Sequence, residues 1–193
     1  MMQLVGDDVV DLDDLQNVRH HPRFAARITN DEERTLLARS SDPHVLLWTL
    51  FAAKEAAFKV AAKLRPAPVF AHARFAVAPD LASVRWDGLE LLLRIHRGAG
   101  YVHAIATTEP GPIETRVAEI GLGEDPSRAA RALLGREVTR APAPGSWDGF
   151  GPPRLRCGLD VSLSHDGRFV SFALPLRTTA TTCRAAPPSS RWR

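Results

Sequence analysis

The chain of 193 residues is 45% hydrophobic and 24% charged, a composition typical of a globular protein that buries a core. It argues against a membrane protein, because no segment approaches the roughly 18 apolar residues of a spanning helix, and the aspartate-rich N-terminus lacks the basic segment of a secretory signal. The net charge of +3 is too small to choose among nucleic acid, acidic proteins and phosphorylated cofactors as partners.

The first half of the chain, which we place at residues 1–110, alternates between the apolar patterns of strands and helices. Its predicted elements are a strand at residues 1–12, helical structure at 13–39 with a cap at Thr29 or Asn30, a long helix at 44–64, and strands at 69–77, 83–86, 89–96 and 101–107. Pro66 ends the long helix, because a proline disfavours helical backbone in the residue before it.

The second half, residues 111–177, shows the same kinds of pattern in a shorter span. Its predicted elements are a strand at residues 113–122, a helix at 126–138 capped by Asp125, a Pro/Gly-rich loop at 141–153 and a hairpin with strands at 160–164 and 168–174. Residues 178–193 have no periodicity, and we expect them to be disordered.

Two segments of the chain are weakly alike. Residues 93–106 (LRIHRGAGYVHAIA) and 161–173 (VSLSHDGRFVSFA) each show a strand that ends in histidine, a glycine turn and an apolar strand. This similarity predicts a duplicated helix-plus-hairpin unit, and hence an α+β pseudo-twofold protein with a cleft between its halves. Chance similarity between two hairpins is the alternative.

An aspartate-rich segment opens the chain. On a strand, Asp8 shares a face with Leu4, Val10 and Leu12, and a carboxylate on an apolar face needs a partner such as a cation. Asp-rich segments also cap turns and helices, and from this segment alone capping is favoured over metal binding.

The long predicted helix carries Glu55 and all the lysines of the chain, Lys54, Lys59 and Lys63. In a chain that otherwise uses arginine, this grouping suits a compact ammonium that meets a phosphate, although chance clustering on a solvated face is equally open. Glu55 and Lys59 stand four residues apart, the spacing of a surface ion pair. Alternatively, small neighbours such as Ala56 let a ligand approach Glu55, which would then bind Mg²⁺ with Asp8.

The segment VSLSHDG at residues 161–167 places Ser164 and His165 at a strand end, where both can donate to a phosphate or a ribose hydroxyl. Adjacent Ser-His-Asp is not a hydrolase triad, since triads are assembled from separated positions. There is no P-loop and no H-E-x-x-H motif, and the remaining histidines lack the cysteine or helical partners of a zinc site.

Together these segments resemble the 4′-phosphopantetheinyl transferase superfamily. The carrying motifs are GDDVVDL at residues 6–12, FAAKEAAFK at 51–59 and SLSHD at 162–166, with GPPRL at 151–155 as a typical lead-in. Their order is that of the small holo-acyl-carrier-protein-synthase type, whereas the length is nearer the double-length type. The resemblance therefore implies a fused pseudo-dimer, with Asp8 and Glu55 from one half and His165 from the other.

The resemblance also assigns roles to residues. It implies that Asp8 and Glu55 ligate Mg²⁺, that Lys59 contacts the pyrophosphate of coenzyme A, and that Ser164 and His165 bind its 3′-phosphoadenosine end. Glu55 and Lys59 are the expected catalytic residues, and either Glu55 or a metal-bound water is the base. Lys54 is a further expected cofactor contact. Arg23 and Arg27 both lie outside the motifs, at positions where related enzymes often carry basic residues that contact the cofactor or the carrier, and Arg23 is counted among the expected cofactor contacts. Val10 stands where double-length members carry a third acid, so two protein carboxylates are expected on the metal.

The implied activity is Mg²⁺-dependent transfer of 4′-phosphopantetheine from coenzyme A to a serine of an apo acyl or peptidyl carrier protein, with release of 3′,5′-ADP. Such carriers serve fatty-acid, polyketide and nonribosomal-peptide synthesis, and they are typically acidic, which suits a mildly basic partner. The alternative is a non-catalytic member that binds coenzyme A or a carrier. A nucleic-acid-binding protein is disfavoured, because the chain has few aromatic residues and no reading motif.

Only Cys157 and Cys183 are cysteines, too few for a disulfide scaffold. We therefore expect two thiols and a reducing cytoplasmic location. The resemblance implies that the pseudo-dimer is a monomer, and we expect neither a membrane nor a nucleic-acid partner.

Overall fold

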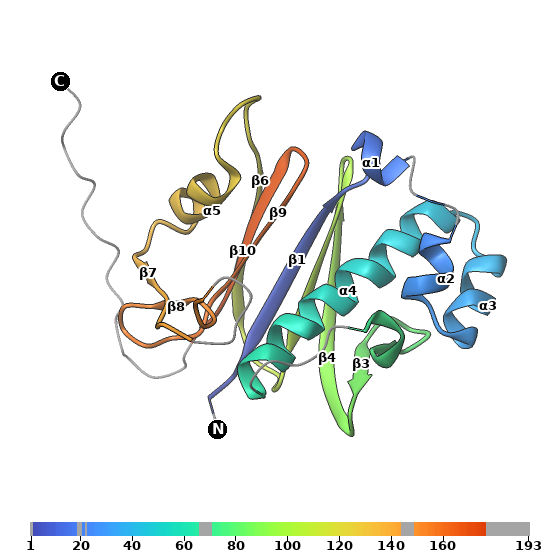
Figure 1. Cartoon of the computed structure of the whole chain (residues 1–193), viewed down its shortest axis with the longest axis horizontal. Coiled ribbons are helices and arrows are strands. Elements are labelled where there is room, and N and C mark those ends of the chain that lie inside the picture. Colours follow the sequence, from blue (N-terminus) through green and yellow to red (C-terminus); the bar gives the residue numbers. More distant parts are fainter. Residues whose placement is uncertain (1, 19–20, 22, 66–70, 144–148, 177–193) are drawn as a thin grey trace.

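The structure is a computed structural model that describes residues 2–18, 21, 23–65, 71–143 and 149–176 (Figure 1). Helices pack against antiparallel sheets, which confirms the predicted α+β class. The first half contains β1 (Val5–Asp11), α1 (Leu15–Val18), α2 (Phe24–Ile28), α3 (Asp31–Arg39), α4 (Pro43–Leu64), the 3-10 turn η1 (His72–Arg74), β2 (Ala76–Val77), β3 (Ser83–Trp86), β4 (Leu89–Gly98) and β5 (Tyr101–Thr107). The second half contains β6 (Ile113–Glu119), α5 (Pro126–Leu134), β7 (Val138–Thr139), β8 (Arg154–Leu155), β9 (Ser162–Asp166) and β10 (Phe169–Pro175).

The two halves share a strand order. The first sheet runs β1-β5-β4-β3-β2 and the second runs β6-β10-β9, so the first strand of each half pairs with the second strand of a hairpin. In each half a helix, α4 or α5, lies between that first strand and the hairpin in chain order. The two similar sequence segments fall on the β4–β5 and β9–β10 hairpins. The pseudo-twofold relation itself stays a prediction.

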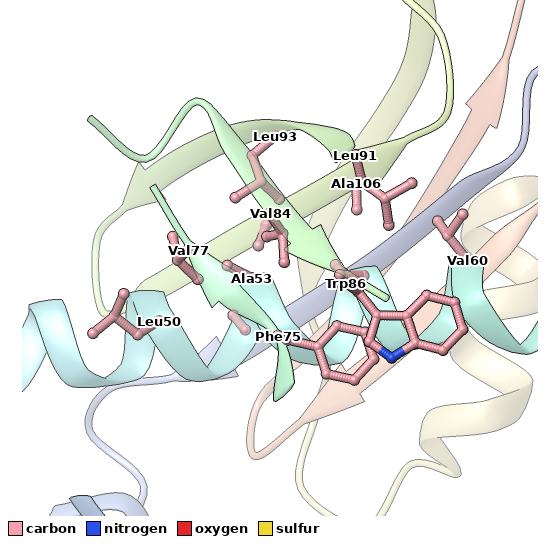
Figure 2. Packing of buried hydrophobic residues seen from close by; sticks show 14 of the residues in the cluster. Leu50, Ala53, Val60, Phe75, Val77, Val84, Trp86, Leu91, Leu93 and Ala106 are labelled. Carbon is pink, nitrogen blue, oxygen red and sulfur yellow. The ribbon is translucent and has the colours of Figure 1, made fainter. Parts of the chain in front are cut away.

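Helix α4 is the central element of the first half and crosses the sheet in Figure 1. Its start is fixed by Asp42, whose side chain accepts a hydrogen bond from the N–H of Val45 at 3.0 Å, and by Pro43 in the first turn. Figure 2 shows the helix face packed against the sheet, where Phe75 stacks on Trp86 with ring centroids 5.5 Å apart. The helix predicted at residues 44–64 is therefore present, with its apolar face in the core.

Gly6 allows β1 and α4 to lie unusually close together. A Cβ atom at Gly6 would lie 2.0 Å from the carbonyl oxygen of Ala56, a distance that no side chain tolerates. Other small residues of α4, Ala53 and Ala57 among them, are fully buried in the core. This close approach brings the segment after Gly6 beside the middle of the helix.

Several predicted bounds were wrong. The helical region at 13–39 is divided into α1, α2 and α3, and only α3 has a complete capping box, formed by Asn30 and Glu33. The helix predicted to reach residue 138 ends at Leu134, because Gly135 has a left-handed backbone with φ 64°. The strands of the final hairpin lie one or two residues later than predicted, at Ser162–Asp166 and Phe169–Pro175, and the short strands β7 and β8 were not predicted.

Some predictions concern residues that the structure does not describe, and the structure revises others. Part of the strand predicted at 69–77 and the whole segment 178–193 lie outside the described residues, and the rest of that predicted strand contains η1 (His72–Arg74) and the short strand β2 (Ala76–Val77). Cys157 is disulfide-bonded, so the expectation of two thiols is not supported. In the described part of the chain, no helix combines the length and apolar character needed to cross a membrane.

Candidate active site

Three segments that are far apart in the sequence meet at one cavity of about 210 Å³. Asp8 of β1, Glu55 of α4 and His165 of β9 all line it. Its remaining lining residues are Val9, Val10, Asn17, Phe24, Trp48, Phe51 and Asp166. The close packing of Gly6 on α4 explains why Asp8 and Glu55 share this cavity.

Asp8 is largely buried, with 8% exposure, and it is held by two donors. Its Oδ1 accepts hydrogen bonds from Ser164 Oγ at 2.7 Å and from Lys59 Nζ at 3.0 Å. Burial raises the pKa of Asp8 to about 6, and the nearby charge of Glu55 acts in the same direction. The ammonium of Lys59 opposes this rise in pKa but does not cancel it.

Lys59 pairs with β1 and not with its own helix neighbour. Besides Asp8, its Nζ donates to the carbonyl oxygen of Asp7 at 2.6 Å, so the surface ion pair with Glu55 that the spacing suggested is not the contact made. Burial lowers the pKa of Lys59, but the charges of Asp8 and Asp7 outweigh burial and hold it above its usual value. The lysine therefore stays charged beside the carboxylates.

The donor set of this cavity fits Mg²⁺. Carboxylate oxygens are the protein ligands that Mg²⁺ prefers, and the ion usually keeps waters and substrate phosphates in its other positions. Asp8 and Glu55 line one cavity, and the charge of Glu55 raises the pKa of Asp8, so a divalent cation would relieve the repulsion between them. Among the described residues no group of three or more His, Cys, Asp or Glu side chains is arranged for a metal. The expectation of two protein carboxylates on the metal stays a prediction.

The Ser-His segment contributes to the cavity in two different ways. His165 is exposed and lines the cavity, whereas Ser164 is buried and points to Asp8. Asp166 follows them and accepts from Asn17 Nδ2 at 2.7 Å and from the N–H of Asp11 at 2.9 Å. Burial raises the pKa of Asp166. These bonds hold the end of β9 against β1.

Lys54, which we expected to contact the cofactor, lies in the core instead. Its side chain is fully buried, and its Nζ donates to Glu33 Oε2 and to the carbonyl oxygen of Ile28, both at 2.6 Å. Burial lowers the pKa of Lys54. It does not line the cavity, so we withdraw it from the expected cofactor contacts. Arg23 and Arg27 are exposed on and beside α2, and Arg23 precedes the cavity residue Phe24.

The third lysine, Lys63, also has buried oxygen partners. Its Nζ donates to the carbonyl oxygens of Val5 at 2.5 Å and Val161 at 2.9 Å and to Asp160 Oδ2 at 2.9 Å. All three donors of the ammonium are thereby used. The lysine cluster thus has a structural explanation that neither solvation nor phosphate binding supplied: Lys54 joins α4 to α2 and α3, Lys59 joins it to β1, and Lys63 joins it to β1 and to the segment before β9.

An aromatic wall beside the carboxylates was not predicted as part of the site. The ring of Phe24 lies 5.0 Å from that of Trp48 and 5.6 Å from that of Phe51, and Phe51 stacks on His72 at 5.4 Å. His72 Nε2 also lies 3.8 Å from Glu55 Oε1. The spacing of Trp48, Phe51 and Glu55 along one helix face was a usable signal, whereas Phe24 and His72 come from other elements and gave none.

Residues 4–106 match the model of a protein family described as the 4′-phosphopantetheinyl transferase superfamily. Among solved structures, the crystal structure of Thermotoga maritima holo-[acyl-carrier-protein] synthase is similar to this chain, with 18% sequence identity and a TM-score of 0.41. That similarity covers 78% of this chain and 82% of the other. No curated protein sequence matches the chain. The matched family segment contains Asp8, Glu55 and Lys59 and ends before β9.

Proposed function

The chain belongs to the 4′-phosphopantetheinyl transferase superfamily, and we propose that it transfers 4′-phosphopantetheine from coenzyme A to a serine of an apo acyl or peptidyl carrier protein. The observation that carries this proposal is that Asp8, Glu55 and His165, from three separate motifs, line one cavity. Mg²⁺ held by Asp8 and Glu55 would neutralise charge on the pyrophosphate of coenzyme A.

The reaction exchanges one phosphorus–oxygen bond for another. The serine oxygen of the carrier bonds to the phosphorus that bears the pantetheine, and the bond from that phosphorus to the bridging oxygen of the pyrophosphate breaks. The bridging oxygen keeps the electron pair and leaves as part of 3′,5′-ADP. The serine loses its proton to a base, so catalysis depends on positioning and on charge stabilisation.

We assign the base to Glu55. Its side chain is 25% exposed at the cavity, whereas Asp8 already accepts two hydrogen bonds. The imidazole of His72, which stacks on Phe51, lies beside the Glu55 carboxylate and restricts where it can turn. When the serine hydroxyl of the carrier lies within hydrogen-bond distance of this carboxylate, the carboxylate can accept its proton.

Lys59 and His165 are assigned to the phosphates. Two of the three N–H donors of Lys59 are used within the described residues, which leaves one for a pyrophosphate oxygen. His165 is exposed and lines the cavity, where it can donate to the 3′-phosphoadenosine end, and Arg23 lies next to the cavity residue Phe24. We also propose a monomer in which the two halves together form this site.

Incubation with coenzyme A, Mg²⁺ and a panel of apo carrier proteins tests the proposal. We expect a carrier to gain the mass of one phosphopantetheine group, with an equal amount of 3′,5′-ADP released. Glu55→Ala should lower the transfer rate by at least about 10²-fold, the cost of removing one electrostatic contact to developing charge. Glu32→Gln changes an exposed acid of α3 and is the matched control.

The non-catalytic alternative gives a different result in the same experiment. Retained binding of coenzyme A without a mass gain on any carrier would support a binding member and overturn the transfer reaction. Full activity of Glu55→Ala would remove Glu55 from the catalytic site.

A further inference from the structure

The outer edge of β1 is closed by side chains. Its inner edge pairs with β5 along the whole strand. On the outer edge, alternate N–H groups of β1 donate to side chains of the β9 segment: Val5 to Asp160 Oδ2 at 2.7 Å, Asp7 to Ser162 Oγ at 2.9 Å and Asp11 to Asp166 Oδ2 at 2.9 Å. Each pair is separated by 155 positions, so β9 runs parallel to β1 and turns alternate side chains toward it.

The carbonyl groups on the same edge have side-chain donors as well. They belong to the residues whose N–H groups are capped: Val5 accepts from Lys63 at 2.5 Å, Asp7 from Lys59 at 2.6 Å and Asp11 from Asn17 at 2.8 Å. An unpaired strand edge normally exposes such groups, and burying them without partners is costly. The side chains therefore replace the backbone partner that β1 lacks.

Ser164 does not follow this pattern, in which alternate side chains of the β9 segment accept from N–H groups of β1. The same separation places Ser164 opposite the N–H of Val9, the one outward N–H between those of Asp7 and Asp11. The Ser164 hydroxyl instead donates to Asp8 Oδ1 at 2.7 Å. Ser164, which precedes the cavity residue His165, therefore donates to the Asp8 carboxylate and does not cap an N–H of the strand edge.

We propose that Ser164 is a positioning residue for the Asp8 carboxylate and does not contact the nucleotide end of coenzyme A. The inference rests on the proposed function. A hydroxyl has one proton to donate and phosphate oxygens accept, so the donor committed to Asp8 is not available to a phosphate. Ser164 is also only 6% exposed, whereas the next residue, His165, is exposed.

The hydrogen bond from Ser164 to Asp8 orients the Asp8 carboxylate. Ser164 and Lys59 both donate to Oδ1 of Asp8, and among the described residues no donor reaches Oδ2. Fixing Oδ1 sets the plane of the carboxylate and leaves Oδ2 for a divalent cation. Removal of a side chain that orients a metal ligand in this way typically weakens the metal affinity by roughly 10- to 100-fold.

Binding measurements with Ser164→Ala test the inference, with Ser162→Ala as the matched control. Ser162 lies on the same face of β9 and is also buried, at 2% exposure, but it caps the N–H of Asp7. In Ser164→Ala we expect the Kd for Mn²⁺, measured without coenzyme A, to rise about 10- to 100-fold. The Kd for 3′,5′-ADP in EDTA should not change. Ser162→Ala should lower the melting temperature and leave the Mn²⁺ affinity unchanged.

Three results would overturn the inference: unchanged Mn²⁺ affinity in Ser164→Ala, weaker 3′,5′-ADP binding in that variant, or an equal loss of Mn²⁺ affinity in Ser162→Ala. If Ser164→Ala does not fold, Ser164→Cys keeps the size and replaces the hydroxyl with a weak donor. A wild-type protein that transfers phosphopantetheine while Ser164→Ala binds Mn²⁺ normally contradicts this inference alone. A wild-type protein that binds neither Mn²⁺ nor coenzyme A contradicts the proposed function as well.

Discussion

Lys63→Met should destabilise the protein more than any exposed charge substitution, because it leaves a buried carboxylate without its cation. The side chains of Lys63 and Asp160 are 2% and 1% exposed, and Lys63 makes three hydrogen bonds that methionine cannot make. Asp160 would keep only the N–H of Val5, and its Oδ1 is buried without a partner among the described residues. Breaking a buried pair by removing one partner costs about 3–5 kcal/mol.

Urea unfolding followed by tryptophan fluorescence measures this loss, and a domain of this size should melt lower by about 2–4 °C per kcal/mol. Arg156→Met is the matched control, since Arg156 and Glu137 form an ion pair with exposures of 79% and 60%, and such pairs contribute at most about 1 kcal/mol. The double variant Lys63→Met/Asp160→Asn should cost less than the sum of its single changes. Unfolding of Lys63→Met at the same urea concentration as the control would refute the reasoning.

Other substitutions test the remaining parts of the account. Gly6→Ala should displace α4 from β1 and lower both stability and transfer, because its Cβ would lie 2.0 Å from the Ala56 carbonyl oxygen; a wild-type melting temperature would contradict this. Lys54→Met should destabilise the fold by leaving Glu33 buried and unpaired, and the KM for coenzyme A in the folded fraction should stay at the wild-type value. Acid should unfold the protein through Asp7, whose pKa is about 2 when folded despite burial, because its histidine partner favours the charged form. Since the folded pKa lies below the unfolded one, about 2 kcal/mol of stability is present above pH 4 and lost as pH falls toward 2, and Asp7→Asn should flatten this dependence in acid titrations followed by circular dichroism.

The sequence predicted those features that depend on neighbouring residues. Helix α4 was expected because its apolar spacing and the proline that follows it are both read directly from the segment, whereas its cap at Asp42 was found only in the structure. The strands around Asp87-Gly88 were expected for the same reason, since a glycine turn joins them directly. The motif order also indicated that Asp8, Glu55 and His165 belong to one site, and the structure brings these three residues to one cavity.

Contacts between residues that are far apart in the sequence could not be predicted from the sequence. Lys54 meets Glu33 across 21 positions and Lys63 meets Asp160 across 97, and neither spacing carries a periodic signal. Helix α2 begins at Phe24, whose ring packs against Trp48, and the charge pattern did not indicate this contact. Ser164 belonged to a recognisable motif, but its partner Asp8 is 156 positions away, so its direction was visible only in the structure.

The central claim is that Asp8 and Glu55 act through one divalent cation in phosphopantetheine transfer. Transfer rates of the wild type, Asp8→Asn, Glu55→Gln and the double variant, measured on one apo carrier over a Mg²⁺ titration, test it most directly. We predict that each single variant loses most of the activity and that the double variant is no slower than the worse single one, because residues that act as a unit are not additive. Losses that multiply in the double variant, or transfer that persists in EDTA, would contradict the claim.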